Sequence, residues 1–252
     1  MKKTKILILT TTMLLVVMLG CADIVTSVNA DVDSGNNISV YGSGKIIEIE
    51  KDYSQFINVE QHYSFRASVT KGNKFSVIIR IDDNLEDYLD VYQNGNTLVL
   101  GMEGGYNYKN ITMEAEIIMP DLESLNLSGA SFSDINDFNF IHDLFLGLSG
   151  ASRVEGDINT GDIHFELSGA SSIDLSGSGK NFFVHCSGAS NLNLVNFSGK
   201  SADVHLSGAS VATLNVSNSL KADLSGASVL YYLGNPNSTN FSTSGESRVV
   251  KL

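Results

Sequence analysis

The chain has 252 residues, of which 23 are glycine and two are proline, and it contains no tryptophan. This composition is typical of many short strands joined by glycine turns. The formal net charge of −12 argues against nucleic acids and anionic lipid surfaces as partners, because both carry negative charge.

The first 20 residues resemble a secretory signal peptide. Three lysines stand among the first five residues, and the apolar stretch Ile6–Leu19 is shorter than the ~20 apolar residues that span a bilayer. It ends in Met18-Leu19-Gly20-Cys21, which resembles the lipobox cleaved by the lipoprotein signal peptidase, with Met18 where leucine is usual. The resemblance implies that Cys21 becomes the lipidated N-terminus. Ordinary secretion, with cleavage after Ala30, is the alternative.

Removal of residues 1–20 changes the charge and the cysteine chemistry. The formal net charge becomes −15, since three of the 16 basic residues are lost, and lipidation of Cys21 leaves Cys186 without a partner. No disulfide framework is then available, so we expect the stability to come from packing. Residues 21–40 are polar and irregular and are expected to form a flexible tether. The folded domain is expected over residues 41–252.

Residues 41–119 show strand patterns without a clean repeat. Apolar and polar residues alternate in stretches such as Phe65–Val69 and Phe75–Ile81, as in strands with one buried face. The acidic stretch Asp82–Val91 is expected to hold a short helix or loop. The loop Gly101–Asn110 is rich in glycine and tyrosine, and exposed tyrosines can stack on sugar rings. We expect the strands to continue the sheets of the second half with longer turns.

A tetrapeptide repeat dominates residues 120–252. Ser-Gly-Ala-Ser occurs six times, followed by the altered copy Ser244-Gly245-Glu246-Ser247, at spacings of 21, 19, 19, 20, 18 and 19 residues. Such spacing is typical of a solenoid, in which each coil buries its apolar face against its neighbours. The expected structural corners contain Ser128, Gly129, Ala130, Ser149, Gly150, Ala151, Ser168, Gly169, Ala170, Ser187, Gly188, Ala189, Ser207, Gly208, Ala209, Ser225, Gly226 and Ala227.

The residues before each corner alternate as they do in a strand. Leucine precedes five of the six Ser-Gly-Ala-Ser copies and Cys186 precedes the other, and a second apolar residue stands two positions earlier. We therefore predict an all-β, single-domain parallel β-solenoid with coils of about 19 residues stacked ~4.8 Å apart. Cys186 fills a leucine position and is expected to be a small buried hydrophobe, not a nucleophile.

Each residue of the corner has an expected role. Glycine allows φ > 0 at the sharp turn, alanine is expected to avoid a collision with the next coil, and the serines are expected to bond to the nearby backbone. Glu246 in the last copy is expected to mark a solvated cap. Without a cap, the unpaired strand edges of an open end would allow end-to-end dimers.

Several motifs resemble one bacterial family. They include Gly42-Ser43-Gly44, Phe56-Ile57-x-Val59, Asn94-Gly95-x-x-Leu98 and the junction of Met119-Pro120 with the first Ser-Gly-Ala-Ser. Together they resemble the family named putative auto-transporter adhesin, head GIN domain, over about residues 40–252. The resemblance implies a β-solenoid exported to the cell envelope, commonly as a lipoprotein, on the periplasmic or outer surface.

One outward column contains candidate metal ligands. In a stack in register, Glu166, His185, His205 and Asp223 lie ~4.8 Å apart, and imidazoles and carboxylates are ligands of divalent metals. The alternative is a solvated polar ladder. It is favoured because Asn126 and Gly147 continue the same column with weak or no ligands. We therefore expect no metal and no cofactor.

A second column contains candidate catalytic residues. Asp134, Glu155 and Asp174 follow successive corners, and Arg153 lies beside them. Clustered carboxylates with an arginine are what a polysaccharide lyase or hydrolase needs, and they also suit Ca²⁺. Residues without carboxylates continue the column, which favours an ordinary acidic surface.

These observations predict a non-catalytic cell-envelope lipoprotein. It is expected to be an adhesin-like or structural binding module that contacts a glycan or another envelope protein, and to touch the membrane only through its lipid. The alternative is a polysaccharide-acting enzyme on the same scaffold. That alternative requires a concave groove over Asp134, Glu155 and Asp174.

Overall fold

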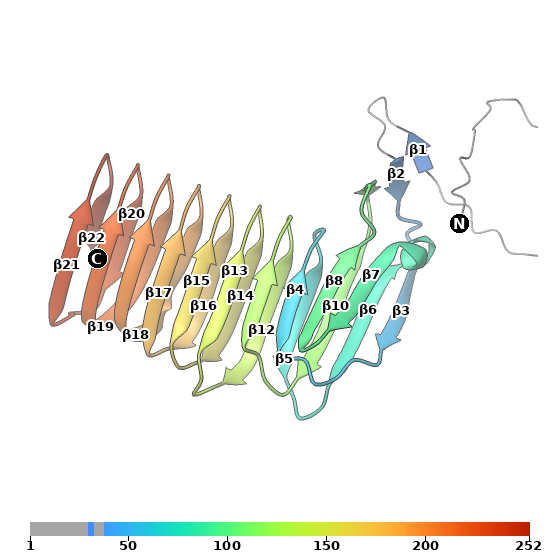
Figure 1. Ribbon diagram of the computed structural model, residues 1–252, viewed down its shortest axis with the longest axis horizontal. Coiled ribbons are helices and arrows are strands. Elements are labelled where there is room, and N and C mark those ends of the chain that lie inside the picture. Colours follow the sequence, from blue (N-terminus) through green and yellow to red (C-terminus); the bar gives the residue numbers. More distant parts are fainter. Residues whose placement is uncertain (1–29, 33–37) are drawn as a thin grey trace, which may run out of the picture.

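A computed structural model describes residues 30–32 and 38–252. The predicted signal peptide, its lipidation site Cys21 and most of the predicted tether lie outside the described residues. Figure 1 shows a long stack of strands that advances coil by coil toward the C-terminal end. The one helix among the described residues, η1 (Asp83–Tyr88), is a 3₁₀ helix in the stretch predicted as a short helix or loop. No helix in this part of the chain is long and apolar enough to cross a membrane.

The repeat half forms two parallel ladders that meet at the corners (Figure 1). The predicted parallel β-solenoid is therefore confirmed for this half. Ladder A, before the corners, consists of β11 (Ser124–Leu127), β13 (Leu144–Leu148), β15 (Ile163–Leu167), β17 (Asn181–Cys186), the second parts of β18 (Asn191–Leu206) and β19 (Val211–Leu224), and β21 (Ser238–Thr243). Ladder B, after the corners, consists of β12 (Phe132–Asn139), β14 (Arg153–Asn159), β16 (Ser172–Ser178), the first parts of β18 and β19, β20 (Val229–Leu233) and β22 (Arg248–Lys251).

Side chains alternate between core and solvent along both ladders. The apolar residues before the corners point inward, and like positions stack because the register repeats from coil to coil. Phe165, Phe182 and Phe197 are fully buried, and successive rings lie 6.3 and 5.5 Å apart between centroids. Burying a side chain of this size contributes roughly 1.5–3 kcal/mol. Packing of apolar side chains between coils therefore supplies the core that no single coil has.

The corner glycines allow the coils to approach closely. All seven of them, from Gly129 to Gly245, have φ between 69° and 75°. The amide of Ala189 donates to the carbonyl of Gly169, one coil earlier, at 2.7 Å, and the same bond recurs at other corners. A Cβ on Gly188 would lie 2.5 Å from that carbonyl oxygen. The left-handed backbone and the close contact both exclude a larger residue.

The second serine and the alanine of each corner have different roles. The second serine is buried, and its hydroxyl donates to the carbonyl of the first serine at about 3 Å, as Ser190 does to Ser187 at 3.0 Å. This bond closes the turn. The alanines lie exposed at the outer edge of the corner. The expectation that alanine avoids a collision between coils is therefore wrong, since glycine occupies the crowded position.

The first half continues both ladders, as expected. In ladder A, β4 (Asn58–Gln61) pairs in parallel with β11 and with β8 (Thr97–Met102). In ladder B, β5 (Arg66–Lys71) pairs in parallel with β12 and with β10 (Met113–Met119). The corner between β4 and β5 contains Tyr63 and Ser64 at φ 59° and 74°, where the repeat uses glycine. Such backbone strain costs ~1–3 kcal/mol per residue.

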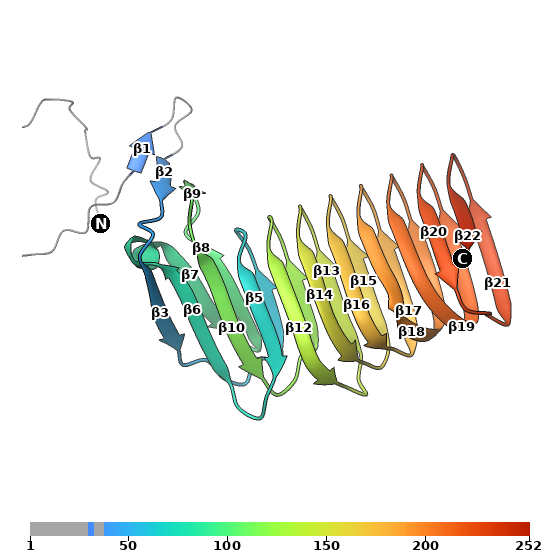
Figure 2. The same ribbon diagram turned by 180° about the vertical axis from the view of Figure 1, so that it is seen from behind.

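Three pairings of the main sheet at the N-terminal end are antiparallel, which the sequence did not predict. β6 (Ser76–Asp82) pairs with β10, β3 (Ile46–Lys51) pairs with β6, and β7 (Leu89–Asn94) pairs with β8. The chain reverses between β7 and β8 through Gly95 at φ 60°. Antiparallel strands need only such a tight turn, whereas parallel strands need a longer crossover. Figure 2 shows β3 at this edge of the stack.

A small second sheet lies beside the N-terminal end of the stack (Figure 2). β1 (Ala30–Val32) pairs antiparallel with β2 (Ile38–Tyr41), and β2 pairs in parallel with β9 (Tyr106–Lys109). Val40 is fully buried. Residues 38–40, which the sequence assigned to the tether, thus form part of the folded domain.

The last coil carries polar residues at core positions. Thr239, Thr243 and Lys251 pair with Leu220, Leu224 and Tyr232 of the coil before. All six residues of β21 are exposed. Polar substitutions of this kind are typical of a capping repeat, which shields the core at the end of a solenoid.

The corner geometry predicts that Gly188→Ala destabilises the protein strongly, whereas Ala189→Ser is tolerated. The added methyl group of the first variant meets the Gly169 carbonyl, and alanine is strained at φ 71°. We expect a loss of at least ~2 kcal/mol. The neighbouring Ala189 is exposed, so its hydroxyl variant should change stability by less than about 0.5 kcal/mol. Guanidinium unfolding followed by circular dichroism measures both, and equal stabilities would contradict the steric argument.

Candidate functional site

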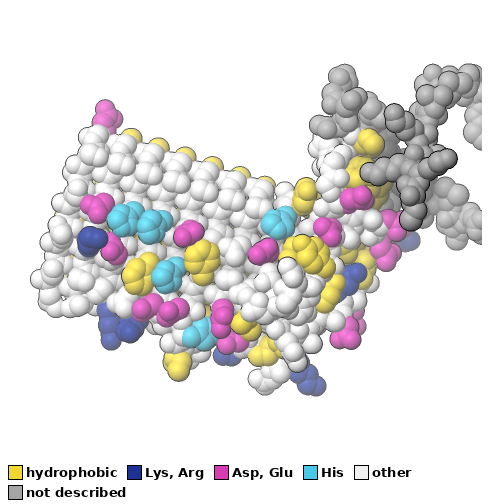
Figure 3. All heavy atoms as spheres, viewed as in Figure 1, with side chains coloured by type: hydrophobic (Ala, Val, Ile, Leu, Met, Phe, Trp, Pro, Cys, Tyr) yellow, Lys and Arg dark blue, Asp and Glu magenta, His cyan; other side chains and the backbone are white. Residues whose placement is uncertain are grey.

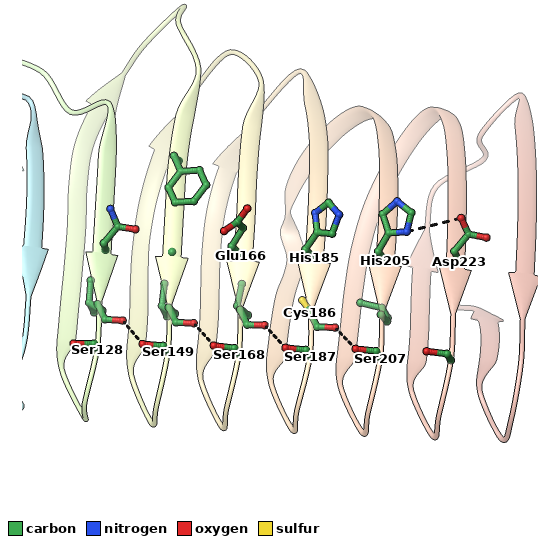
Figure 4. Close-up of a pocket in the computed structure, with 18 of the residues that line it drawn as sticks. Ser128, Ser149, Glu166, Ser168, His185, Cys186, Ser187, His205, Ser207 and Asp223 are labelled. Atoms are coloured by element: carbon green, nitrogen blue, oxygen red, sulfur yellow. Dashed lines mark hydrogen bonds and ion pairs between the residues drawn. The ribbon is translucent and has the colours of Figure 1, made fainter.

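One groove of about 780 Å³ crosses the outer side of ladder A. Its lining runs from Glu60 on β4 to Ser244 after β21, so the groove follows the stack across the strands. One wall is an outward column of ladder A, and the other is the row of first corner serines (Figure 4). We call it groove A. Its column consists of Glu60, Asn126, Gly147, Glu166, His185, His205, Asp223 and Ser242.

The predicted metal ligands Glu166, His185, His205 and Asp223 lie in this column, on successive coils (Figure 4). The rings of His185 and His205 stack with centroids 4.8 Å apart and planes 16° apart. His205 Nδ1 lies 3.8 Å from an oxygen of Asp223. Each coil contributes one side chain, so stacking spreads the ligands along the axis. The described residues contain no group of three or more histidine, cysteine or acidic side chains that could hold a metal ion.

A second outward column beside groove A adds aromatic rings that the sequence reasoning missed. His164 and Phe183 stack with centroids 4.6 Å apart and planes 14° apart. Asp203 continues the column and pairs with Lys221 at 3.1 Å. These residues stand two positions before the members of the first column. The same period of two would have placed them on this face. Figure 3 shows histidine and acidic side chains gathered here.

Phe145 enters groove A over Gly147. Phe145 lines the groove, and a Cβ on Gly147 would lie 3.0 Å from its ring and 2.3 Å from the amide oxygen of Asn126. The glycine thus makes room for the aromatic ring. At Gly147, which adds no side chain to the column, the neighbouring phenylalanine occupies the space.

The serine wall supplies one hydroxyl from each coil. The first serine of each corner donates its amide to the coil before, as Ser187 does to Leu167 at 2.9 Å. The hydroxyl of Ser187 lies 3.4 Å from the same carbonyl, and those of Ser149 and Ser168 lie 3.5 Å from theirs. Such O···O distances exceed the 2.5–3.0 Å of a good hydrogen bond. The backbone bonds therefore hold the corner, and the hydroxyls remain available to a ligand.

The predicted catalytic residues lie on ladder B, away from groove A. Asp134, Glu155 and Asp174 pair in register, as the columns predicted. Arg153 Nε donates to Glu155 at 2.5 Å, and the side-chain amide of Asn193 donates to the carboxylate of Asp174 at 3.0 Å. Glu155 and Asp174 are thus bonded to side chains of their own ladder, Asp134 lines a separate pocket with Arg66 and Phe132, and none of the three carboxylates lines groove A.

Tyrosines of the loop Gly101–Asn110 and of β20 pack on other aromatic rings of the fold. Tyr106 and Tyr108 pack their rings against Tyr88, at centroid distances of 4.9 and 6.1 Å. Burial raises the pKa of Tyr108, whose hydroxyl donates to the carbonyl of Glu103 at 2.8 Å. Tyr232 packs on Phe241 of the last coil, at 5.9 Å between ring centroids. None of these residues lines groove A.

The fold and groove A define a β-solenoid with a ligand-accessible surface along one ladder. The chain belongs to the family described as "Putative auto-transporter adhesin, head GIN domain", whose model matches residues 55–236. Membership favours a binding role over catalysis and an exported or surface location. No curated protein matches the sequence.

Solved structures share the fold over nearly their whole length. A putative adhesin from Bacteroides fragilis is 19% identical, with a TM-score of 0.79, and the match covers 84% of this chain and 99% of that one. A putative lipid binding protein from Parabacteroides distasonis is 17% identical, with a TM-score of 0.72 and coverages of 85% and 99%. A putative adhesin from Parabacteroides merdae is 15% identical, with a TM-score of 0.68 and the same coverages. At these identities the likeness shows the fold alone.

Cys186 is expected to resist thiol reagents in the folded protein. Its side chain is 3% exposed, and burial raises its pKa to about 12, so the reactive thiolate is scarce near neutral pH. In the full chain with Cys21→Ser, native labelling by Ellman's reagent should be at least ~100-fold slower than labelling after unfolding in guanidinium. Rapid native labelling would show that this part of ladder A opens, contrary to the packing described.

Proposed function

We propose that this chain is a non-catalytic, lipid-anchored adhesin module of the cell envelope that binds a glycan in groove A. The observation that carries the proposal is the alternation of aromatic rings with hydroxyl and carboxylate groups along one groove. Phe145 and the stacked pair His185 and His205 line groove A, and the stacked pair His164 and Phe183 lies in the column beside it.

The chemistry of the groove suits sugars. A sugar ring has an apolar face and a rim of hydroxyls, so its sites combine aromatic surfaces with a few placed polar groups. Groove A offers Phe145 as an apolar surface, with Asn126 and Glu166 on the coils to either side. Corner hydroxyls such as Ser149 and Ser168 face the same space. In the middle of the groove, polar groups thus lie beside aromatic rings.

The direction of the groove suits a polymer. Groove A crosses the strands, so its groups repeat at the coil spacing of ~4.8 Å along the stack. An extended polysaccharide presents similar groups at each sugar and gains affinity from many weak contacts at once. The ladder is held by backbone hydrogen bonds, so little conformational freedom is lost on binding.

Other ligands fit groove A less well. The similar structure from Parabacteroides distasonis is described as a lipid binding protein. A lipid chain needs a continuous apolar surface, whereas Glu60, Glu166 and Asp223 place carboxylates along groove A. An envelope protein is the other partner class. It would bury a wide flat face, and the test below separates it from a glycan.

The proposal predicts that Phe183→Ala and His185→Ala each weaken binding to an array of bacterial and host oligosaccharides. Loss of one stacking surface should lower affinity about tenfold. The measurement is the apparent Kd of the full chain for its best array ligand. Tyr231→Ala, which removes an aromatic ring from ladder B, is the matched control and should leave affinity unchanged.

Two results would contradict the proposal. Absence of binding to any glycan, with capture of a purified envelope protein instead, would favour the protein partner. Loss of binding in Glu155→Ala and Asp174→Ala, with no effect of Phe183→Ala, would move the site to ladder B and revive the enzyme alternative.

The lipid anchor is tested by Cys21→Ser. The wild-type chain should incorporate a clickable fatty acid in growing cells and sediment with the membranes. Cys21→Ser should lose the label and become soluble, because the anchor is its only membrane attachment in this proposal. Cys186→Ala is the matched control and should keep the label. A labelled, membrane-bound Cys21→Ser variant would rule out lipidation at this residue.

A further inference from the structure

We infer that groove A selects glycans that carry positively charged amino groups, an inference that rests on the glycan binding proposed above. The lining of the groove contains Glu60, Glu166 and Asp223 but no lysine or arginine. Lys221, on the same ladder, is paired with Asp203 in the neighbouring column. Positive charge in the groove would come only from protonation of its histidines.

The carboxylates recur at a regular interval. Along the pairing order of ladder A, Glu166 stands three coils after Glu60, and Asp223 stands three coils after Glu166. Three coils correspond to about 14 Å along the stack. Such spacing matches a polymer whose charged groups recur along its length better than a single small ligand.

Each carboxylate has an aromatic neighbour in the groove. Glu166 lies between the coils of Phe145 and His185. Asp223 follows His205, whose ring lies 3.8 Å from it, and Glu60 lies 3.9 Å from the ring of His62. A sugar stacked on one of these rings would bring its substituents to the adjacent carboxylate. An ammonium group there gains a charge-assisted hydrogen bond and attraction to the aromatic face.

The exposure of these groups determines how they act. The side chains of Glu60 and Asp223 are 42% and 47% exposed, so each ion pair with a ligand is weak on its own. Selectivity therefore requires several contacts along one chain. Glu60, Glu166 and Asp223 would repel the carboxylates of a uronic acid polymer. Groove A therefore discriminates against anionic glycans.

The test compares glucosamine oligosaccharides of one length and linkage in three forms: with free amines, N-acetylated and N-trimethylated. Binding of the full chain with Cys21→Ser is measured by biolayer interferometry at neutral pH and low salt. The trimethylated form carries a fixed charge at neutral pH, where the free amine is only partly protonated. We expect both cationic forms to bind at least about tenfold more tightly than the N-acetylated form, with the difference shrinking as salt rises.

Variants locate the effect. Glu166→Gln and Asp223→Asn should each weaken binding of the cationic forms about three- to tenfold and leave binding of the N-acetylated form unchanged. Glu155→Gln and Asp174→Asn remove carboxylates from adjacent coils of ladder B and should change nothing.

Each outcome decides a separate claim. Equal binding of all three forms, unaffected by Glu166→Gln, overturns the selectivity while glycan binding stands. Tighter binding of a uronic acid oligosaccharide also overturns it. Loss of cationic binding in the ladder B variants shows general attraction to an acidic protein instead of recognition by groove A. If no form binds and the array is also silent, the proposed function itself fails.

Discussion

The structure depends on the hydrogen bonds between successive corners. At each of them a backbone amide reaches the glycine carbonyl one coil away, at 2.7 Å between Ala189 and Gly169, and only a glycine in the left-handed region admits this approach. The bond recurs along the stack, so it sets the register of both ladders. A slip by one residue would turn every core side chain outward. The Ser-Gly-Ala-Ser corner thus fixes how successive coils align. The turn alone explains its small residues, without a ligand.

The alignment of the coils gives the alternating strand sequences a regular outer surface. Once the coils are aligned, each outward position becomes a column, and groups that are weak alone recur along one line. Groove A arises between the column of His185 and the row that contains Ser187. Its hydroxyls remain available because the corner is held by backbone bonds, with Ser187 Oγ 3.4 Å from the nearest carbonyl. The same rigidity that builds the core therefore prepares a ligand surface at no further cost in conformational freedom.

The sequence was informative wherever the repeat is regular. The spacing of the corners predicted the parallel ladders, and alternation placed Glu166 and His185 in one column, because local patterns determine which face a residue occupies. The groove itself could not be predicted. It depends on the ring of Phe145 turning over Gly147, which is a matter of side-chain conformation. It also depends on β4 pairing with β11, whose partners Asn58 and Ser124 are far apart in sequence and share no motif. The antiparallel pairings at the N-terminal end were not predicted either, because the hairpins there contain no Ser-Gly-Ala-Ser corner that would mark them in the sequence.

The irregular half is more than a cap, because it extends groove A. Without β4 in register, the groove would contain only the carboxylates of Glu166 and Asp223, and Glu60 would not line it. That register is kept across a corner with no glycine: Ser128 donates to Gln61 at 2.9 Å and Phe132 to Phe65 at 2.8 Å, on either side of the strained Tyr63 and Ser64. The flanking bonds thus hold a backbone conformation that these residues disfavour. Through the pairing of β4 with β11, the regular repeat thus supports a part of the groove that it does not encode.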